Sequence, residues 1–366
     1  AEGTIRLMDA AGAASFMVED ACVMPEFRPI GDRPLLGKVI TKTEDLRVVY
    51  HDLLSESGVE KLFYAHLCGA VRAERRVTGL VVDCLEGPAI ITGKVFVDAT
   101  GDAHLVHRAG GATEQAPPEA TMHKSVFFMV GGVAPHDPQV NAKHYRQLFA
   151  AGAIPEGFWA HLGHCHQLEP GIVQLPIAHA NGDACSSADM TRLDHELRRR
   201  NFEVVDFMKR EMAGYAHCFP VHAAQQVCVR SGRRIRGVTK LTEDVIARDE
   251  LPADPVTPIV RSYGSHAPEQ KQGFAPAGRV SRAGFSAIPY GAMVPTEFDN
   301  VLACGRCIAV EERLMDTIRM MTTCMATGQA AAVAATLAID GHLPALGDVP
   351  YRDLRQGLLK LGCIPD

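Results

Sequence analysis

The run from Lys94 to Asp102, with the sequence KVFVDATGD, constrains this chain more than any other segment. Its apolar half predicts a buried strand, and Gly101 predicts a turn at the carboxyl end of that strand. Ligands commonly bind at such a carboxyl edge in α/β sheets. Gly101 permits close approach of the backbone, and the Asp102 carboxylate can accept hydrogen bonds from ligand hydroxyls. The alternative is an ordinary turn into a helix that Asp102 caps.

The spacing of hydrophobic residues predicts further helices and strands along the chain. Leu46, Val49 and Leu53 share one face of a helix predicted over 44–57. Short β-rich runs follow at 59–64, 66–73, 77–85, 89–91 and 94–98. Further along we expect a strand at 126–133, charged and short helices at 191–212 and from 242, a polar loop at 261–284, a strand at 300–303 and a helix at 322–339.

The composition is that of a globular protein without an extreme charge. The 37 basic and 43 acidic residues leave a net charge of −6, which argues against a broad nucleic-acid or anionic-membrane surface. Eleven cysteines are an odd number in a long chain, so we expect free thiols in the reducing cytoplasm. We predict no membrane span, because no run reaches the ~18 apolar residues that one needs.

A second glycine-containing turn lies near the C-terminus. The strand predicted at 300–303 runs into Cys-Gly-Arg-Cys at 304–307, and a helix of small residues begins near 321. Such a turn and a helix N-terminus can direct backbone N–H groups at an electron-rich ligand. The alternative is a helix that only packs tightly on a sheet.

Three strings then occur in one order: VFVDATGDAHLVHRAGG from 95, VRSGRRIRGVTKLTEDV from 229, and NVLACGRCIAVEERLMDTIRMMTTCMATGQAAAVAA from 300. Together they resemble the FAD-dependent oxidoreductase family of the glutathione-reductase-like superfamily, akin to fumarate reductase flavoproteins. The resemblance covers about residues 40–345, and its C-terminal string is the most specific part.

The resemblance implies an α/β fold, in which a Rossmann-like FAD-binding domain carries an inserted α+β substrate domain. The FAD-binding domain would comprise 1–112 and 291–366, and the substrate domain 113–290. The helix that begins near 321 would stabilise negative charge on the reduced flavin. The residues implied to bind FAD are Asp98, Thr100, Gly101, Asp102, Gly305, Arg306, Arg319, Met321, Thr322, Thr323 and Gly328.

One departure from the family pattern concerns the first βαβ unit. Families of this kind open with a strand and a GxGxxG turn that holds the FAD pyrophosphate, and this sequence has no such string. Three explanations are open for the missing GxGxxG string. A separate polypeptide or a cleaved N-terminal segment carries it, the chain is truncated, or the protein is a relative that no longer binds FAD. We expect the first βαβ unit to be missing from this chain and a second segment to complete it, and we expect an oligomer.

The function implied is hydride transfer between a small organic substrate and FAD, by the whole enzyme or its larger piece. A structural subunit that packs against a flavoprotein partner, without catalysis, is the first alternative. A metal-binding protein built on His161, His164, Cys165 and His166 is the second. A polar loop explains the same histidines, and we predict no metal site.

Two candidate catalytic residues come from the basic run and its surroundings. Arginines 230, 233, 234 and 236 can bind a carboxylate or the flavin, and we select Arg234. His222 is the candidate for proton transfer. The alternatives are a solvated basic face and a structural histidine.

The Cys304–Cys307 pair has the CxxC spacing of a redox dithiol. The other interpretation is two buried small side chains that flank a glycine turn.

Overall fold

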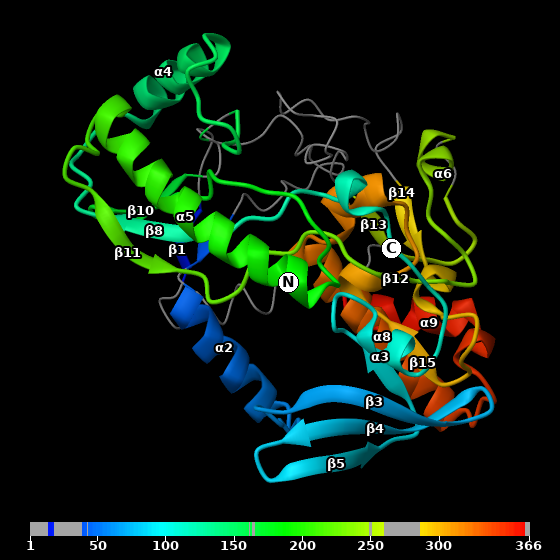
Figure 1. Cartoon of the computed structure of the whole chain (residues 1–366). Coiled ribbons are helices and arrows are strands. Elements are labelled where there is room, and N and C mark those ends of the chain that lie inside the picture. The colour runs from blue at the N-terminus through cyan, green and yellow to red at the C-terminus, as the bar shows by residue number, and fades with distance from the viewer. Residues whose placement is uncertain are drawn as a thin grey trace.

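The computed structural model (Figure 1) describes residues 14–17, 39–41, 43–160, 162, 165–248, 251–259 and 286–362. The polar loop predicted at 261–284 lies outside these residues. β1 (Ala14–Met17) pairs with β2 (Val39–Thr41) in an antiparallel arrangement, and α2 (Thr43–Glu56) follows them in the chain. α2 confirms the helix predicted over 44–57.

An antiparallel three-stranded sheet follows α2. Its strands, in spatial order, are β3 (His66–Ala73), β4 (Arg76–Cys84) and β5 (Gly87–Thr92). Val77 and Val82 on β4 are buried, while Ile90 on β5 is an exposed apolar side chain. Three of the predicted β-rich runs are thereby confirmed. The strand predicted at 59–64 is wrong: this segment is irregular, and its apolar side chains are exposed instead of paired.

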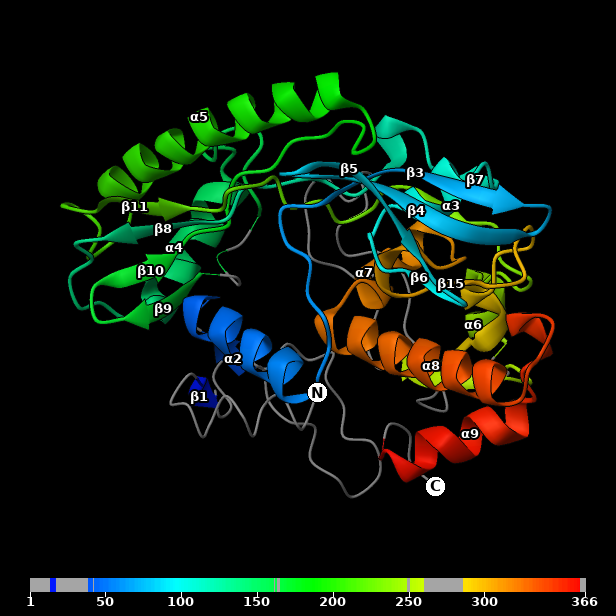
Figure 2. The same cartoon turned by 90° about the horizontal axis from the view of Figure 1, so that it is seen from below.

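A parallel pair of strands lies at the centre of the first of the two hydrophobic cores. β6 (Phe96–Asp98) pairs with β15 (Val301–Ala303), and the register joins Phe96 to Val301 and Asp98 to Ala303. Figure 2 shows α8 and α9 on one side of this pair and the β3–β4–β5 sheet on the other. Both strands confirm predicted runs. The adjoining elements are α3 (His104–Arg108), β7 (Thr113–Glu114), η1 (Pro118–Ala120) and β12 (Arg234–Ile235), which pairs with β7.

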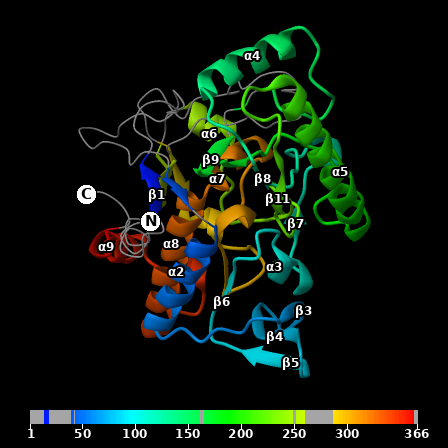
Figure 3. The same ribbon diagram turned by 90° about the vertical axis from the view of Figure 1, so that its left-hand side faces the viewer.

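A second core lies around a four-stranded antiparallel sheet with the order β11–β8–β10–β9. The long helix α5 covers one face of this sheet (Figures 1 and 3), because Val204 and Met208 pack in the same cluster as Val130 of β8. The bounds are β8 (Phe128–Gly131), α4 (Pro138–Ala150), β9 (His166–Glu169), β10 (Ile172–Gln174), α5 (Ser187–Glu211) and β11 (Phe219–Ala223). The predicted strand at 126–133 and helix at 191–212 are confirmed in place and type.

The chain then returns to the first core. Ile235, Leu241, Ile246 and Ile259 all pack in the cluster that contains the β6–β15 pair. The predicted boundary of the substrate domain at 290 stays a prediction, and core packing favours a change of core near residue 230. The bounds are α6 (Glu243–Ala247), β13 (Pro255–Ile259), β14 (Ser286–Pro289), η2 (Tyr290–Met293), η3 (Gly305–Cys307), η4 (Glu312–Leu314), α7 (Met315–Ile318), α8 (Met321–Asp340), η5 (Leu346–Asp348) and α9 (Tyr351–Lys360).

α8 is apolar on nearly all sides. Within the described ranges it is the one helix whose length, 20 residues, and mean hydropathy, 1.3, would allow it to cross a membrane. One face, with Ala330, Ala334 and Thr327, is buried in the first core, but only 33% of the apolar window is buried. Core helices commonly have this composition, and the absence of a membrane span stays a prediction.

Candidate functional site

Two turns meet at the carboxyl ends of β6 and β15. Because these strands are parallel, the turn after Asp98 and the turn after Ala303 leave the same edge of the sheet. The Cys304 N–H donates to the Asp98 carbonyl oxygen at 3.1 Å, which extends the ladder into the second turn. Segments about two hundred positions apart thus form one edge, and both were predicted to bind a ligand.

The Asp98 carboxylate shapes the first turn. It is buried, and one oxygen accepts from the Thr100 N–H and hydroxyl at 3.1 and 2.6 Å. The other oxygen accepts from the Val106 N–H at 3.1 Å, and the Thr100 hydroxyl oxygen accepts from the His104 N–H at 2.9 Å. Asp98 and Thr100 therefore hold the turn and the start of α3 in place, while the backbone of the turn stays open to a ligand.

Asp102 and Arg306 join the two turns. Arg306 Nη2 lies 2.8 Å from Asp102 Oδ2, and both side chains are mostly buried. Arg306 Nη1 also donates to the carbonyl oxygen of Val229 at 2.8 Å. Gly101 has φ +81°, and a Cβ there would lie 2.6 Å from Arg306 Nη2, so glycine is needed for both conformation and space.

The alternative role of Asp102 as a helix cap is wrong. α3 begins after Ala103 and has no side-chain cap, while the Asp102 carboxylate points to Arg306. Asp102 Oδ1 is buried and has no hydrogen-bond partner among the described residues. Burial raises the pKa of Asp102 above its ordinary value, and the nearby charge of Arg306 opposes this shift only in part. An acceptor held in this way is suited to a hydroxyl donor.

The second turn is fixed to α8. Gly305 has φ +71°, and its N–H donates to the Thr327 hydroxyl at 2.9 Å. The Thr323 hydroxyl donates to the carbonyl of Thr317 at 3.1 Å, which anchors the first turn of α8. Met321 and Thr322 at the start of α8 are exposed, and a Cβ at Gly328 would meet no atom within 4 Å. The helix therefore begins beside the second turn, and its first two residues are exposed.

Comparison with known proteins decides the family. The family model described as FAD dependent oxidoreductase matches residues 21–358. The chain belongs to this family. Its cofactor is FAD, as predicted, and the α/β fold with a Rossmann-like FAD-binding part is confirmed.

Three solved structures resemble the chain at low identity. A geranylgeranyl bacteriochlorophyll reductase-like protein from Thermoplasma acidophilum has 10% identity and a TM-score of 0.44 over 90% of this chain and 62% of its own. The p-nitrophenol 4-monooxygenase of Pseudomonas putida has 10% identity and 0.40, over 88% and 59%. CabE, an aromatic hydroxylase from angucycline biosynthesis, has 13% and 0.43, over 98% and 63%.

The chain thus spans about three fifths of the length of these proteins. No curated protein matches it.

The residues of the two turns fit FAD. Asp102 Oδ1 is a buried acceptor without a partner in the described part of the chain, as a ribityl or ribose hydroxyl would require. Arg306 supplies a charge for phosphate, and α8 presents its N-terminus beside it. The assignment of individual residues stays a prediction.

Gly232, Arg233 and His104, which the sequence did not indicate as FAD ligands, lie against the first turn. A Cβ at Gly232 would lie 2.0 Å from Asp102 Oδ1, so glycine is required there. Arg233 donates to the Asp102 carbonyl at 3.3 Å, and its Nη2 lies 3.1 Å from His104 Nδ1. The string VRSGRR marked this segment, but only the fold brings it to the turn.

The predicted site residues Arg234, which is buried, and Arg319, which is half-buried, both form ion pairs. Arg234 pairs with Glu312, which also accepts from the Met122 N–H at 3.2 Å. Arg319 pairs with the fully buried Asp316 at 3.0 Å. Neither carboxylate was predicted, although ERLMD lies inside the C-terminal string.

His222 lies apart from these groups. It is exposed on β11, an edge strand of the second sheet, opposite Met129. The structure does not join His222 to the FAD turns by any contact among described residues, and its proposed role in proton transfer stays a prediction.

The CxxC pair is buried beneath the second turn. Burial raises the pKa of Cys304 to about 11 and that of Cys307 further. The Cys307 thiol donates to the Asp98 carbonyl at 3.4 Å. Because only the thiolate is nucleophilic, this environment favours the interpretation of two structural side chains.

The alternative of a metal site depends on histidines that lie mostly outside the described residues. His161 and His164 lie outside the described residues, as does the side chain of His166. Among the residues that are described, no group of histidine, cysteine and acidic side chains could hold a metal ion.

Proposed function

We propose that the chain forms most of an FAD-dependent oxidoreductase, in which a small organic substrate exchanges a hydride with FAD. The observation that carries this proposal is the Asp102–Arg306 contact at 2.8 Å, because it joins the turns after two parallel strands at one sheet edge. Nucleotide cofactors bind at such edges.

The chain's own residues would bind and orient the cofactor. Asp102 would accept a hydroxyl, Arg306 would hold a phosphate oxygen, and the N–H groups at the start of α8 would face negative charge. FAD, when bound, supplies the hydride acceptor or donor. The ion pairs of Arg234 with Glu312 and of Arg319 with Asp316 would hold these two arginines in place.

The proposal includes a second segment that completes the cofactor site. Within the described residues β6 pairs on one edge only, and Val97 is 40% exposed, whereas parallel strands are normally buried. The exposed face of α8 lies on the same half of the molecule (Figure 2) and carries Met321 and Ile339. A strand followed by a helix would cover both, as the predicted GxGxxG unit would.

The visible spectrum of the purified protein tests the proposal. We expect flavin absorption bands after co-expression with a GxGxxG segment, and a flavin-to-chain ratio near one. Denaturation should release FAD, identified by mass spectrometry. A colourless, folded complex that binds no added FAD would refute it. A single species of 39.5 kDa that binds FAD stoichiometrically would refute the second segment alone.

A further inference from the structure

His104 and Arg233 are in contact at the first turn, and the proposed function gives neither of them a role. His104 is the first residue of α3, and its N–H donates to the Thr100 hydroxyl oxygen at 2.9 Å. Its ring nitrogen Nδ1 lies 3.1 Å from Arg233 Nη2. Arg233 Nε donates to the carbonyl oxygen of Asp102 at 3.3 Å. One guanidinium therefore contacts both the turn and the helix that follows it.

This contact fixes the protonation state of the His104 ring. A guanidinium has only N–H donors and does not lose its proton in proteins. Nδ1 of His104 is therefore the acceptor, which requires a neutral ring with its hydrogen on Nε2. A protonated ring would carry a hydrogen on Nδ1 as well and would place a second positive charge against Arg233. The contact exists in only one of the two protonation states.

The Arg233 guanidinium depends on His104 for its position. In the described part of the chain no carboxylate forms an ion pair with it, because the nearby Asp102 carboxylate pairs with Arg306 at 2.8 Å. Its side chain donates to His104 and to the Asp102 carbonyl oxygen, and to no other acceptor among the described residues. Without the imidazole acceptor, one bond of 3.3 Å would hold the guanidinium at the turn.

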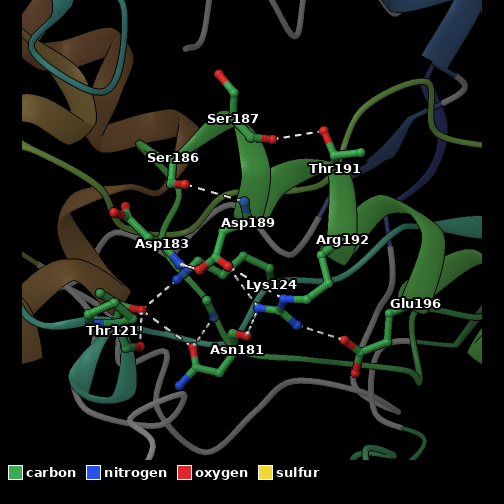
Figure 4. A network of polar contacts seen from close by, with 12 residues as sticks. Thr121, Lys124, Asn181, Asp183, Ser186, Ser187, Asp189, Thr191, Arg192 and Glu196 are labelled. Atoms are coloured by element: carbon green, nitrogen blue, oxygen red, sulfur yellow. Dashed lines mark hydrogen bonds and ion pairs between the residues drawn. The ribbon is translucent and has the colours of Figure 1, made fainter.

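The loop before α5 packs on the backbone of Arg233 without replacing His104. The Cys185 thiol accepts from the Arg233 N–H, which opposes the rise that burial causes in the pKa of that thiol. The carboxylates of this loop are bound elsewhere: Figure 4 shows Asp189 accepting from the Asp183 N–H and pairing with Arg192. The Asp183 carboxylate accepts from the Cys185 N–H at 2.7 Å. Neither carboxylate forms an ion pair with the guanidinium.

The segment 229–233 shapes the proposed cofactor site at both of its ends. The Val229 carbonyl oxygen accepts from Arg306 at 2.8 Å. A Cβ at Gly232 would lie 2.0 Å from Asp102 Oδ1, the acceptor that we propose for an FAD hydroxyl. Gly232 immediately precedes Arg233 in the chain. Release of the Arg233 side chain would therefore loosen the backbone against which the Asp102 carboxylate lies.

We infer that His104 is a positioning residue of the cofactor site: its neutral ring holds Arg233 against the first turn, and protonation of the ring releases Arg233 and weakens the binding of FAD. This inference rests on the proposed function, because it assigns the turn to FAD.

The charged groups around His104 set the direction of the pH dependence. Burial lowers the pKa of His104 below its ordinary value of 6.5, Arg233 and Arg108 of α3 lower it further, and Asp102 and Asp98 of the turn oppose this. The folded state therefore binds fewer protons at this ring than the unfolded state just below pH 6.5. The stability that the contact gives is complete above pH 6.5, and it is lost as the pH falls through the folded pKa.

Nitrogen-15 NMR of the full chain, labelled at histidine, tests the protonation state directly. At pH 7.5 we expect the His104 ring to carry its hydrogen on Nε2 alone, and we expect it to titrate with a midpoint below 6.5. The signals missing from the spectrum of His104→Asn, or of His104→Gln, identify the ring. A hydrogen on Nδ1 at pH 7.5 would overturn the inference.

Two substitutions separate the acceptor from the rest of the ring. The amide oxygen of His104→Asn can occupy the place of Nδ1 and does not titrate, whereas that of His104→Gln lies near the place of Nε2. The chain assembled with its GxGxxG segment is titrated with FAD at pH 7.5 and 5.0, and flavin fluorescence gives Kd. In the wild type we expect Kd to rise about tenfold at pH 5.0, as for a pKa shift of about one unit. His104→Asn should keep the wild-type Kd at pH 7.5 and lose most of this rise, while His104→Gln should bind weakly at both pH values.

His107→Asn, at an exposed position on the same helix, is the matched control and should follow the wild type at both pH values. The Asp102 carboxyl, whose pKa is raised, also titrates in acid, and it contributes equally to the wild type and to the control. An acid-induced rise in Kd that is equal in the wild type and His104→Asn overturns the inference and leaves the proposed function standing.

Urea denaturation of the chain without FAD keeps the two proposals distinct. The wild type should lose more stability than His104→Asn between pH 7.5 and 5.0, because only the wild type carries a titrating acceptor. This result, together with no binding of FAD by any form, would uphold the positioning of Arg233 by His104 and refute the proposed function. An equal loss of stability in both proteins would overturn the positioning itself.

Discussion

At the scale of single residues, buried charges fall into two groups. Asp102 with Arg306, and Arg234 with Glu312, form ion pairs that hold segments far apart in sequence together. Lys124 has no such partner in the described structure, and burial lowers its pKa to about 8. A paired charge adds specificity to a fold, whereas an unpaired one lowers its stability.

Removal of the Lys124 charge should stabilise the protein. The folded pKa lies below the unfolded value of 10.5, so the folded state binds fewer protons between pH 8 and 10.5 and stability rises across that window. At pH 7 the full penalty is present, and Lys124→Met should raise the free energy of unfolding by roughly 2–3 kcal/mol. Urea denaturation at pH 7 and pH 10 measures this. The control Lys143→Met, at an exposed position on α4, should change it by less than ~0.5 kcal/mol. A destabilised Lys124→Met would contradict the prediction.

Arg306→Ala should destabilise the protein and weaken FAD retention. It leaves the Asp102 carboxylate buried without a cation, which costs about 3 kcal/mol. Asp102→Asn removes the uncompensated charge, so the double variant should recover at least ~1 kcal/mol of the loss. Urea denaturation of the four proteins gives the coupling, and the visible spectrum gives the flavin content. Strictly additive effects would show that the pair does not interact.

At the scale of elements, the turn after β6 depends on one glycine for two reasons. Gly101 takes φ +81°, and its missing Cβ leaves space for the Arg306 guanidinium. The sequence predicts this space for a ligand, whereas the nearest described atoms belong to Arg306 of the chain itself. Gly58, after α2, has φ +67° but no atom within 4 Å of a Cβ. A substitution at Gly58 therefore tests the backbone conformation alone, whereas one at Gly101 tests the conformation together with the contact to Arg306.

Gly101→Ala and Gly58→Ala form a matched pair. Both substitutions should cost about 1 kcal/mol, because an L-residue is strained at positive φ. Only Gly101→Ala also displaces Arg306, so only this variant should lose FAD. Urea denaturation and the ratio of flavin to protein absorbance distinguish the two effects. Full flavin retention in folded Gly101→Ala would remove the Arg306 contact from the cofactor site.

At the scale of the whole molecule, the sequence predicted the parts that lie in local strings. Apolar runs and glycine turns located β6, β15 and α8, because burial and turn formation depend on residues that are neighbours in the sequence. The meeting of Asp102 with Arg306 needed the parallel pairing, which no local pattern encodes. The burial of Lys124 was not predicted, for the same reason. Its one sequence signal is a cation directly before an apolar run, and only three-dimensional packing shows that no carboxylate pairs with it in the described ranges.

The open face of α8 gives the last prediction. A helix that is apolar all round is normally buried, yet only 33% of its apolar window is covered, and a Cβ at Gly328 would meet nothing. Insertion into a bilayer would break the bond from the Gly305 N–H to Thr327 that fixes α8 to the FAD turns, so a protein segment is the better occupant.

Ala332 is exposed on this face of α8, and Ala332→Arg should prevent assembly with the GxGxxG segment while the chain itself stays folded. Ala150→Arg, at an exposed position on α4, is the control and should assemble normally. Circular dichroism checks the fold, native mass spectrometry the assembly and the visible spectrum the flavin. The prediction fails if Ala332→Arg assembles and holds FAD like the wild type, because the face that it disrupts would then have no role in completing the site.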